Sequence, residues 1–381
     1  MDAISTNPEI DALLAADSPV AIGVSGGKDS SAVALLTVRH LDSIGHNGPR
    51  LLIHSDLGMT EWKTSLSMCE GLAERLGIPL VVVRRAKGGM MERWEQRWAD
   101  NCARYIALEC VKLILPWSTP GMRFCTSEMK VAPICQDLCS RFAKSLPKKI
   151  VNVTGIRRAE SDGRQNAPVC KAEPKLTSKY KVKQQFEKNG KAVEKTVWLP
   201  STAGVTWNPN LEMSTERVYS YLAENKIPLH EAYTKWDMSR VSCALCILQN
   251  QADQINSLKN PEHHPLFRRM VDLEAVSTFA FQGSSWLADR GPHLLENAVL
   301  AAIASAKKRA ALRQESESVI PDHLLYTKGW PTCIPTAGES EMLAMVRRDV
   351  AAVIGLDVQY TDAESVRERY RELYVAKHGA I

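Results

Sequence analysis

The pattern of apolar and polar positions predicts strands and helices in alternation over the first part of the chain. Short apolar runs have the length of buried strands, and the segments between them carry apolar residues at helical spacing. The expected elements are a helix at 8–17, strands at 20–24, 51–56, 78–83 and 149–155, and helices at 29–45, 61–76, 91–115 and 127–145. Such alternation is typical of the α/β class with a doubly wound parallel sheet, which the segment 149–155 is expected to complete.

The second part of the chain has a different pattern. Polar and apolar residues alternate over 176–199 around Asn189-Gly190, a dipeptide that favours a β-hairpin turn. Apolar spacing beyond it predicts helices at 214–224, 263–280, 292–313, 340–353 and 362–377. We therefore expect two domains: residues 1–250, with a hairpin insertion at about 171–200, and a mainly helical C-terminal region, 251–381, whose role the sequence does not indicate.

A glycine-rich turn, Ser25-Gly26-Gly27-Lys28-Asp29-Ser30, joins the first predicted strand to the next helix. Glycines let the backbone turn tightly and expose N–H groups, and the N-terminus of a helix attracts anions. The spacing differs from that of a Walker phosphate loop, in which four residues separate the two glycines. The turn therefore predicts a phosphate site of another kind.

These six residues resemble the PP-loop of N-type ATP pyrophosphatases, and residues 18–250 resemble the PAPS (phosphoadenosine phosphosulfate) reductase branch of that superfamily. The resemblance implies an adenine nucleotide alpha hydrolase-like fold. Enzymes with a full loop of this kind generally cleave ATP between its α and β phosphates, with Mg²⁺, and transfer AMP to a substrate. The residues implied to hold the phosphates are Ser25, Gly26, Gly27, Lys28, Asp29 and Ser30, of which Lys28 and Asp29 are assigned to catalysis.

Other segments extend the resemblance. In 54–62, Asp56 and Glu61 occupy the places that flank the adenosine, although Asp56 would also suit a helix cap. The segments 123–130 and 155–164 match family patterns rich in basic residues, which neutralise the charge of a triphosphate. Their implied site residues are Arg123 and Arg157 for catalysis and Lys130 and Arg164 for nucleotide binding.

Ten cysteines are many for a chain that is expected to be cytosolic, so thiol or metal chemistry is an open option. Cys243 and Cys246 have metal-ligand spacing. Resemblance to reductases that use adenosine phosphosulfate (APS) and to tRNA thiolation enzymes adds Cys125 as a third ligand of a [4Fe-4S] cluster, although Phe124 replaces the first cysteine of the reductase pair. Zinc and a purely structural role are the alternatives. The candidates for a fourth ligand are Cys135, Cys139 and Cys170.

The net charge of +5 permits an anionic partner without requiring one. The stretch 171–195 holds eight lysines against three glutamates, so the hairpin is a candidate surface for DNA or tRNA; the alternative is a solvated, edge-protecting ribbon. No apolar run has the length of a membrane span, and the N-terminus lacks the order of a signal peptide, so a cytoplasmic location is expected.

The leading hypothesis is a PP-loop enzyme that adenylates a substrate so that sulfur can be introduced, similar to the ATP-pyrophosphatase subunit of DNA phosphorothioate modification. Its expected partners are an adenine nucleotide, a nucleic acid and a sulfur donor such as a cysteine desulfurase. Two alternatives stay open: a PAPS or APS reductase that releases sulfite, and a nucleotide-binding regulator or DNA-binding adaptor without turnover.

Overall fold

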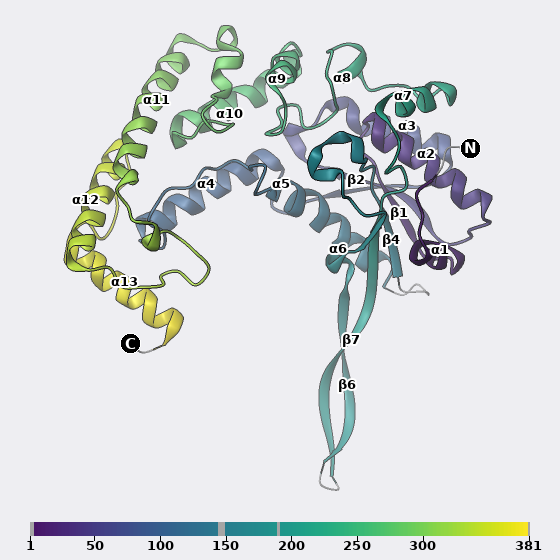
Figure 1. Cartoon of the computed structure of the whole chain (residues 1–381), viewed down its shortest axis with the longest axis horizontal. Helices are drawn as coiled ribbons and strands as arrows, with labels where there is room; N and C mark the ends of the chain where they lie inside the picture. Colours follow the sequence, from purple (N-terminus) through teal and green to yellow (C-terminus); the bar gives the residue numbers. More distant parts are fainter. Residues whose placement is uncertain (1–3, 144–148, 189–190, 380–381) are drawn as a thin grey trace. The chain divides into compact units, whose positions relative to one another are not determined.

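The structure is a computed structural model that describes residues 4–143, 149–188 and 191–379 of the 381-residue chain. The chain divides into two compact units, neither of which is contiguous in sequence (Figure 1). The first consists of Met1–Met90 and Arg123–Cys246, and the second of Met91–Met122 and Ile247–Ile381. The segment 91–122 is thus grouped with the C-terminal residues, whereas the functional division at residue 250 stays a prediction.

The first unit is built on a mostly parallel sheet with the strand order β3-β2-β1-β4-β7-β5, in which β3, β2, β1, β4 and β7 pair in parallel and β5 is antiparallel to β7. Its strands are β1 (Val20–Gly23), β2 (Arg50–Asp56), β3 (Leu80–Arg84), β4 (Lys149–Val153), β5 (Cys170–Ala172) and β7 (Lys191–Trp207). The predicted α/β class with a parallel central sheet is confirmed. The sheet does not end at β4, however, because β7 pairs with it in parallel from Lys149↔Ala203 to Val153↔Trp207.

Alternation along the strands places an apolar core on each face of this sheet. In β1, Val20 and Ile22 belong to one core and Ala21 to the other, as the two-residue period of a strand requires. The first core includes apolar residues of α1 (Pro8–Ala15), α2 (Lys28–Ser43), α3 (Lys63–Leu76) and α7 (Thr215–Glu224). The second is covered by α6 (Ala132–Arg141). Helices on both faces make the sheet doubly wound.

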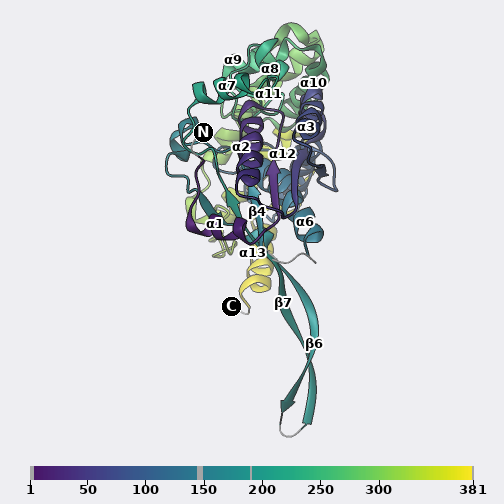
Figure 2. The ribbon, with the colours of Figure 1, turned by 90° about the vertical axis from the view of Figure 1, so that its right-hand side faces the viewer.

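The predicted hairpin is present as β6 (Ser178–Lys188) paired antiparallel with the first part of β7, and it runs far out from the sheet (Figure 1, Figure 2). Its expected turn, Asn189-Gly190, lies outside the described residues. The pairing of β7 with β4 begins at Ala203, which lies opposite Lys149, the first residue of β4. The hairpin therefore leaves the sheet at the end where the parallel strands begin. The glycine-rich turn after β1 lies at the opposite edge, where these strands end.

Two predicted helices are shorter than expected. The helix at 91–115 is α4 (Met90–Ile106), and the chain is irregular from there to residue 122, a stretch that contains Pro116 and Pro120. In place of the helix at 127–145 the chain forms a π-helical turn (Ser127–Val131) and α6, preceded by the short α5 (Phe124–Thr126); residues 144–145 lie outside the described part. Pro133, which has no N–H to donate, stands where the π-turn gives way to α6.

The second unit is helical. Trp94 of α4 packs edge-to-face with Trp117 and Phe281, with ring centroids 5.4 Å and 6.0 Å away. Arg347 is buried and donates to the backbone carbonyls of Tyr105 and Tyr360. The other helices of this unit are α9 (Gln251–Leu258), α10 (His264–Ser277), α11 (Asn297–Ser318), α12 (Ala337–Ile354) and α13 (Ala363–His378). Over the described residues, none of the helices combines the length and apolar character that crossing a membrane requires.

Candidate functional site

The glycine-rich turn between β1 and α2 is held in shape by its own side chains. Ser30 Oγ donates to the Gly27 carbonyl at 2.9 Å and accepts from the Ser25 N–H at 3.2 Å. Gly26 has φ +73°, and a Cβ added there would lie 3.0 Å from the Ser65 carbonyl oxygen. Within the described residues, the N–H groups of Gly26 and Gly27 make no hydrogen bond. Together with the positive N-terminal end of α2, they form a cluster of donors suited to an anion.

An ion network of buried cations lies at the start of α2. Arg157 Nε donates to Asp29 Oδ1 at 2.7 Å, and Lys28 Nζ lies 3.3 Å from Asp29 Oδ2. The side chains of Arg157 and Lys28 are only 3% and 5% exposed. Arg157 also donates to the Met213 carbonyl and to Thr215 Oγ1, which ties α7 to the turn. The structure therefore brings together Lys28, Asp29 and Arg157, three of the four residues assigned to catalysis.

Two tyrosines enclose the Lys28 ammonium. Its Nζ lies 5.1 Å from the ring centroid of Tyr233, in α8 (Glu231–Thr234), and 5.6 Å from that of Tyr219. The Tyr233 hydroxyl accepts from the Lys28 N–H at 3.4 Å and from the Val241 N–H at 3.2 Å. Burial raises the pKa of Tyr233, so the hydroxyl stays neutral at pH 7. Tyr233 thus connects the glycine-rich turn to the segment that leads to Cys243.

Other arginines add positive charge beside this network. Arg164 forms an ion pair with Glu160. Burial lowers the pKa of Arg164, and the charges of Arg123, Arg240 and Arg157 act in the same direction, whereas Asp29 opposes them. Such mutual effects require the guanidinium groups to lie near one another. The predicted residues Arg123, Arg157 and Arg164 therefore share one electropositive region, to which the structure adds Arg240.

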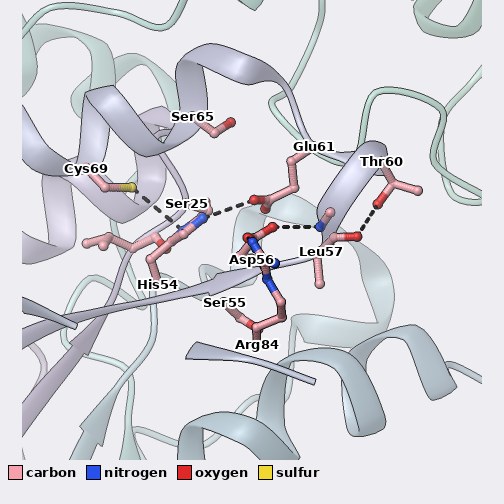
Figure 3. A network of polar contacts seen from close by, with 12 residues as sticks. Ser25, His54, Ser55, Asp56, Leu57, Thr60, Glu61, Ser65, Cys69 and Arg84 are labelled. Atoms are coloured by element: carbon pink, nitrogen blue, oxygen red, sulfur yellow. Dashed lines mark hydrogen bonds and ion pairs between the residues drawn. The ribbon is translucent and has the colours of Figure 1, made fainter. Parts of the chain in front are cut away.

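The predicted nucleoside residues Asp56 and Glu61 are both engaged by the protein (Figure 3). Asp56 Oδ1 accepts from the Gly58 N–H at 2.7 Å, and Oδ2 accepts from Arg84 Nε at 3.0 Å. Burial alone would raise the pKa of Asp56, but these contacts outweigh it and lower the pKa. Glu61 Oε2 lies 3.1 Å from His54 Nε2. Both carboxylates lie at or just beyond the carboxyl end of β2, and their roles toward a nucleoside stay predictions.

Two of the three predicted metal ligands lie together. Cys243 and Cys246 are hydrogen-bonded through their thiols, an interaction that raises the pKa of Cys243, as burial also does. Lys130 and Glu61 influence the same thiol, so the Cys-x-x-Cys segment lies beside predicted site residues. In the described ranges, no group of three or more His, Cys, Asp or Glu side chains is arranged to hold a metal ion. The role of Cys125, which lies in α5, as a third ligand stays a prediction.

The candidate fourth ligands lie in other surroundings. Cys135 is buried in the core beneath α6, and Cys139 Sγ contacts the Leu176 carbonyl at 3.3 Å. Cys170, in β5, lies 3.6 Å from a carboxylate oxygen of Glu9. These contacts match structural roles for the three thiols, and the identity of a fourth ligand stays a prediction.

The sequence interpretation missed several residues of this region. His54 lies inside an apolar strand run, so it was included in the strand and given no role. Nothing in the spacing of Tyr219 and Tyr233 indicates that both rings face Lys28. Arg84 follows the third predicted strand, and its position one strand away from Asp56 could have suggested their pairing.

Comparison with known proteins is consistent with this picture. Residues 19–249 match the family model described as the phosphoadenosine phosphosulfate reductase domain. No curated protein matches the chain. A solved structure of PAPS reductase from Candida auris, in a phosphate complex, is 15% identical, with a TM-score of 0.34, and the match covers 63% of this chain and 97% of that one.

The U34-tRNA thiolase NcsA from Methanococcus maripaludis, solved with its [4Fe-4S] cluster, is 13% identical, with a TM-score of 0.28. That match covers 70% of this chain and 74% of the thiolase. The family match spans more than half of the 381 residues and includes the glycine-rich turn, the arginine segments and the Cys-x-x-Cys pair. The chain therefore belongs to the phosphoadenosine phosphosulfate reductase domain family.

Proposed function

We propose that this chain binds ATP at residues 25–30, cleaves the bond between the α and β phosphates and transfers AMP to an acceptor. The observation that carries the proposal is the complete loop, whose free N–H groups adjoin the buried Lys28–Asp29–Arg157 network. Asp29 and Glu160 balance part of the positive charge of a region that also contains Arg123, Arg164 and Arg240. A triphosphate is an anion of the charge and shape that such a region favours.

In the proposed reaction an acceptor oxygen attacks the α phosphorus, the bond to the bridging oxygen breaks, and pyrophosphate leaves with the bonding electron pair. The acceptor loses its proton to solvent. Lys28 and the arginines stabilise the charge that accumulates on the departing oxygens. When bound, Mg²⁺ would supply further neutralisation of the phosphate oxygens. The loop N–H groups keep the triphosphate in a fixed orientation during the displacement.

The test compares three nucleotides. Purified protein is incubated anaerobically with ATP, PAPS or APS, and pyrophosphate, AMP and sulfite are measured. Because no acceptor is added, water takes its place, and pyrophosphate and AMP are expected in equal amounts from ATP, with no sulfite from PAPS or APS. Sulfite release with a thiol reductant would replace the proposal with the reductase. Tight ATP binding without either product would instead favour a nucleotide-binding regulator.

A nucleic acid is the acceptor class that the hairpin supports. Lys179, Lys181 and Lys183 follow one another at two-residue spacing, which places them on one face of β6. Trp198, 58% exposed, pairs with Lys181 across the strands, and the Lys181 ammonium lies 5.0 Å from its ring centroid. Lysines beside an exposed aromatic ring suit a phosphate backbone and a stacked base. Because the hairpin leaves the sheet opposite the loop, we propose that it anchors a long polymer at a distance from the reacting phosphate.

Replacing Lys179, Lys181 and Lys183 together by glutamine is expected to weaken nucleic-acid binding and to lower its salt dependence. Each phosphate contact contributes about 0.7 to 0.9 to the slope of log K against log salt, so the slope should fall by about 2 to 3. The slope is measured by fluorescence anisotropy with DNA and with tRNA. The control replaces the exposed Lys308, Lys328 and Lys377, which removes the same charge elsewhere. Equal slopes for both triple variants would reject the hairpin as the binding surface.

The remaining predictions rest on the resemblance of motifs. We propose a sulfur-donor protein as partner because AMP transfer activates an acceptor for attack by sulfur, and the link to DNA phosphorothioate modification has the same basis. A [4Fe-4S] cluster is expected to give a brown protein that absorbs near about 400 nm, lost on Cys243→Ser. The hydrogen bond between the thiols of Cys243 and Cys246 supports this proposal, because it brings two of the proposed ligands together.

A further inference from the structure

His54 lies at the centre of the polar network shown in Figure 3. It is the fifth residue of β2, and its side chain is 1% exposed. Nδ1 lies 3.0 Å from the carbonyl oxygen of Val24, the residue immediately before the glycine-rich turn. Nε2 lies 3.1 Å from Glu61 Oε2. One imidazole ring therefore contacts both the entrance to the loop and the turn that follows β2.

Both of these partners favour a protonated nitrogen. A backbone carbonyl only accepts hydrogen bonds, and an ionised carboxylate also only accepts. A neutral histidine carries one N–H and one lone pair, so either neutral tautomer would direct a lone pair at an acceptor. The ring satisfies Val24 and Glu61 together only when both nitrogens carry hydrogen, which is the imidazolium form.

The contacts of His54 reach a third segment. Glu61 follows Thr60, whose carbonyl oxygen accepts from the Ala244 N–H at 2.8 Å, between Cys243 and Cys246. The backbone at Val24 continues directly into Ser25 and Gly26. The imidazolium thus connects the loop, the turn after β2 and, through Thr60, the Cys-x-x-Cys segment, although it lies buried beneath them.

We propose that His54 is a positioning residue: a permanent buried imidazolium that fixes the phosphate loop through Val24 and orients Glu61 beside the Cys-x-x-Cys segment. The effect of His54 on ATP binding rests on the proposed function, whereas the charge state of its ring does not. A fixed positive charge beneath an anion-binding loop also favours a bound phosphate, because the buried site screens it less than water would.

The groups that face the ring support this charge state. Cys69 of α3 lies 3.8 Å from Nδ1, Glu61 contacts Nε2, and Asp56 lies on the same strand. Burial alone would lower the pKa of His54, but the hydrogen bonds with Cys69 and Glu61 and the charge of Glu61 raise it to about 10. A pKa raised on folding gives stability that is complete below about pH 6.5 and is lost as pH rises through about 10.

Nuclear magnetic resonance of the unliganded protein tests the charge directly. The protein is labelled with ¹⁵N-histidine, and the His54 signals are identified by their loss in His54→Gln. Both ring nitrogens are expected to stay protonated from about pH 6 to pH 9. His40 is the internal control, because burial lowers its pKa from the ordinary value and its ring should be neutral above about pH 6.5. A His54 ring that becomes neutral near pH 7 would overturn the proposal.

The positioning role is tested by ATP affinity, measured by calorimetry. His54→Gln keeps a polar side chain but cannot donate to both acceptors with the ring's geometry, and the dissociation constant should rise by about 10-fold or more. The control is His46→Gln, a buried histidine outside the network that contacts the Ser18 carbonyl. If both variants lose thermal stability but keep the wild-type ATP affinity, His54 is structural only and the proposal fails. If wild-type protein binds no ATP, the proposed function fails, and the resonance experiment still decides the charge.

Discussion

Arg157→Met is expected to lower ATP-dependent pyrophosphate release by about 100-fold or more and to reduce the free energy of unfolding by about 2 to 3 kcal/mol. Arg157 is nearly fully buried, and its guanidinium is shared between Asp29, a carbonyl of 213 and the hydroxyl of Thr215. Methionine has a similar length but provides no donor. Among the residues that the structure describes, the Asp29 carboxylate then keeps Lys28 as its ion-pair partner, which draws the ammonium away from the triphosphate.

The stability estimate lies below the usual cost of breaking a fully buried pair because Asp29 is 24% exposed and is partly solvated. Pyrophosphate release is measured with a coupled assay, and unfolding with urea. The matched control is Arg158→Met, since Arg158 pairs with Glu212 at the surface and is 39% exposed. This control should change stability by less than about 1 kcal/mol and leave activity unchanged. If the two variants lose activity and stability equally, Arg157 has no larger role in either than a surface arginine has.

Gly26→Ala is expected to weaken ATP binding by about 100-fold, because the loop must move on the order of 1 Å to relieve two conflicts. Alanine is strained at φ +73°, and its Cβ would lie 3.0 Å from the Ser65 carbonyl and 3.2 Å from Ser65 Cα. Both contacts are with backbone of α3, which cannot rotate away as a flexible side chain could. The displacement changes the direction of the Gly26 and Gly27 N–H groups, which are the donors proposed to hold the phosphates.

Gly71→Ala is the control for this substitution. Gly71 lies in α3, the helix whose backbone a Cβ at Gly26 would contact. A Cβ added at Gly71 itself meets no atom within 4 Å. Alanine is a better helix former than glycine, so the control should gain up to about 1 kcal/mol of stability and bind ATP as wild type does. ATP affinity is measured by calorimetry for both variants. Wild-type affinity in Gly26→Ala would contradict the assignment of the turn as the phosphate site.

The elements that the sequence predicted well are those specified by local pattern. β1 and the turn after it depend on a short apolar run followed by two glycines, and both features lie within about ten consecutive residues. The second half of β7 was less visible, because its alternation continues that of the hairpin although the strand has by then entered the sheet beside β4. Alternation shows that a segment is extended, and it does not show which strand lies beside it.

The candidate site also has a part that local sequence motifs predict and a part that depends on the fold. Lys28, Asp29 and Arg157 could be selected from motifs, but their ion network joins residues more than a hundred positions apart and needed the fold to become visible. His54 was hidden because a histidine between apolar residues is ordinary in a buried strand, and its importance comes from Val24 and Glu61. The sequence shows which residues carry charge, whereas the partner of each charged side chain depends on which strands lie next to each other in the sheet.

The position of α4 in the chain has a consequence for biosynthesis. The ribosome completes α4 well before it makes the segment that contains Phe281, although Trp94 packs against that ring within the second unit. Until that later segment emerges, the apolar face of α4 has no partner there, while most of the nucleotide-binding sequence is still being made. Trp117 follows α4 closely in the chain, but the aromatic cluster around Trp94 stays incomplete until Phe281 is made, and incompletely covered apolar surface of this kind is what chaperones bind.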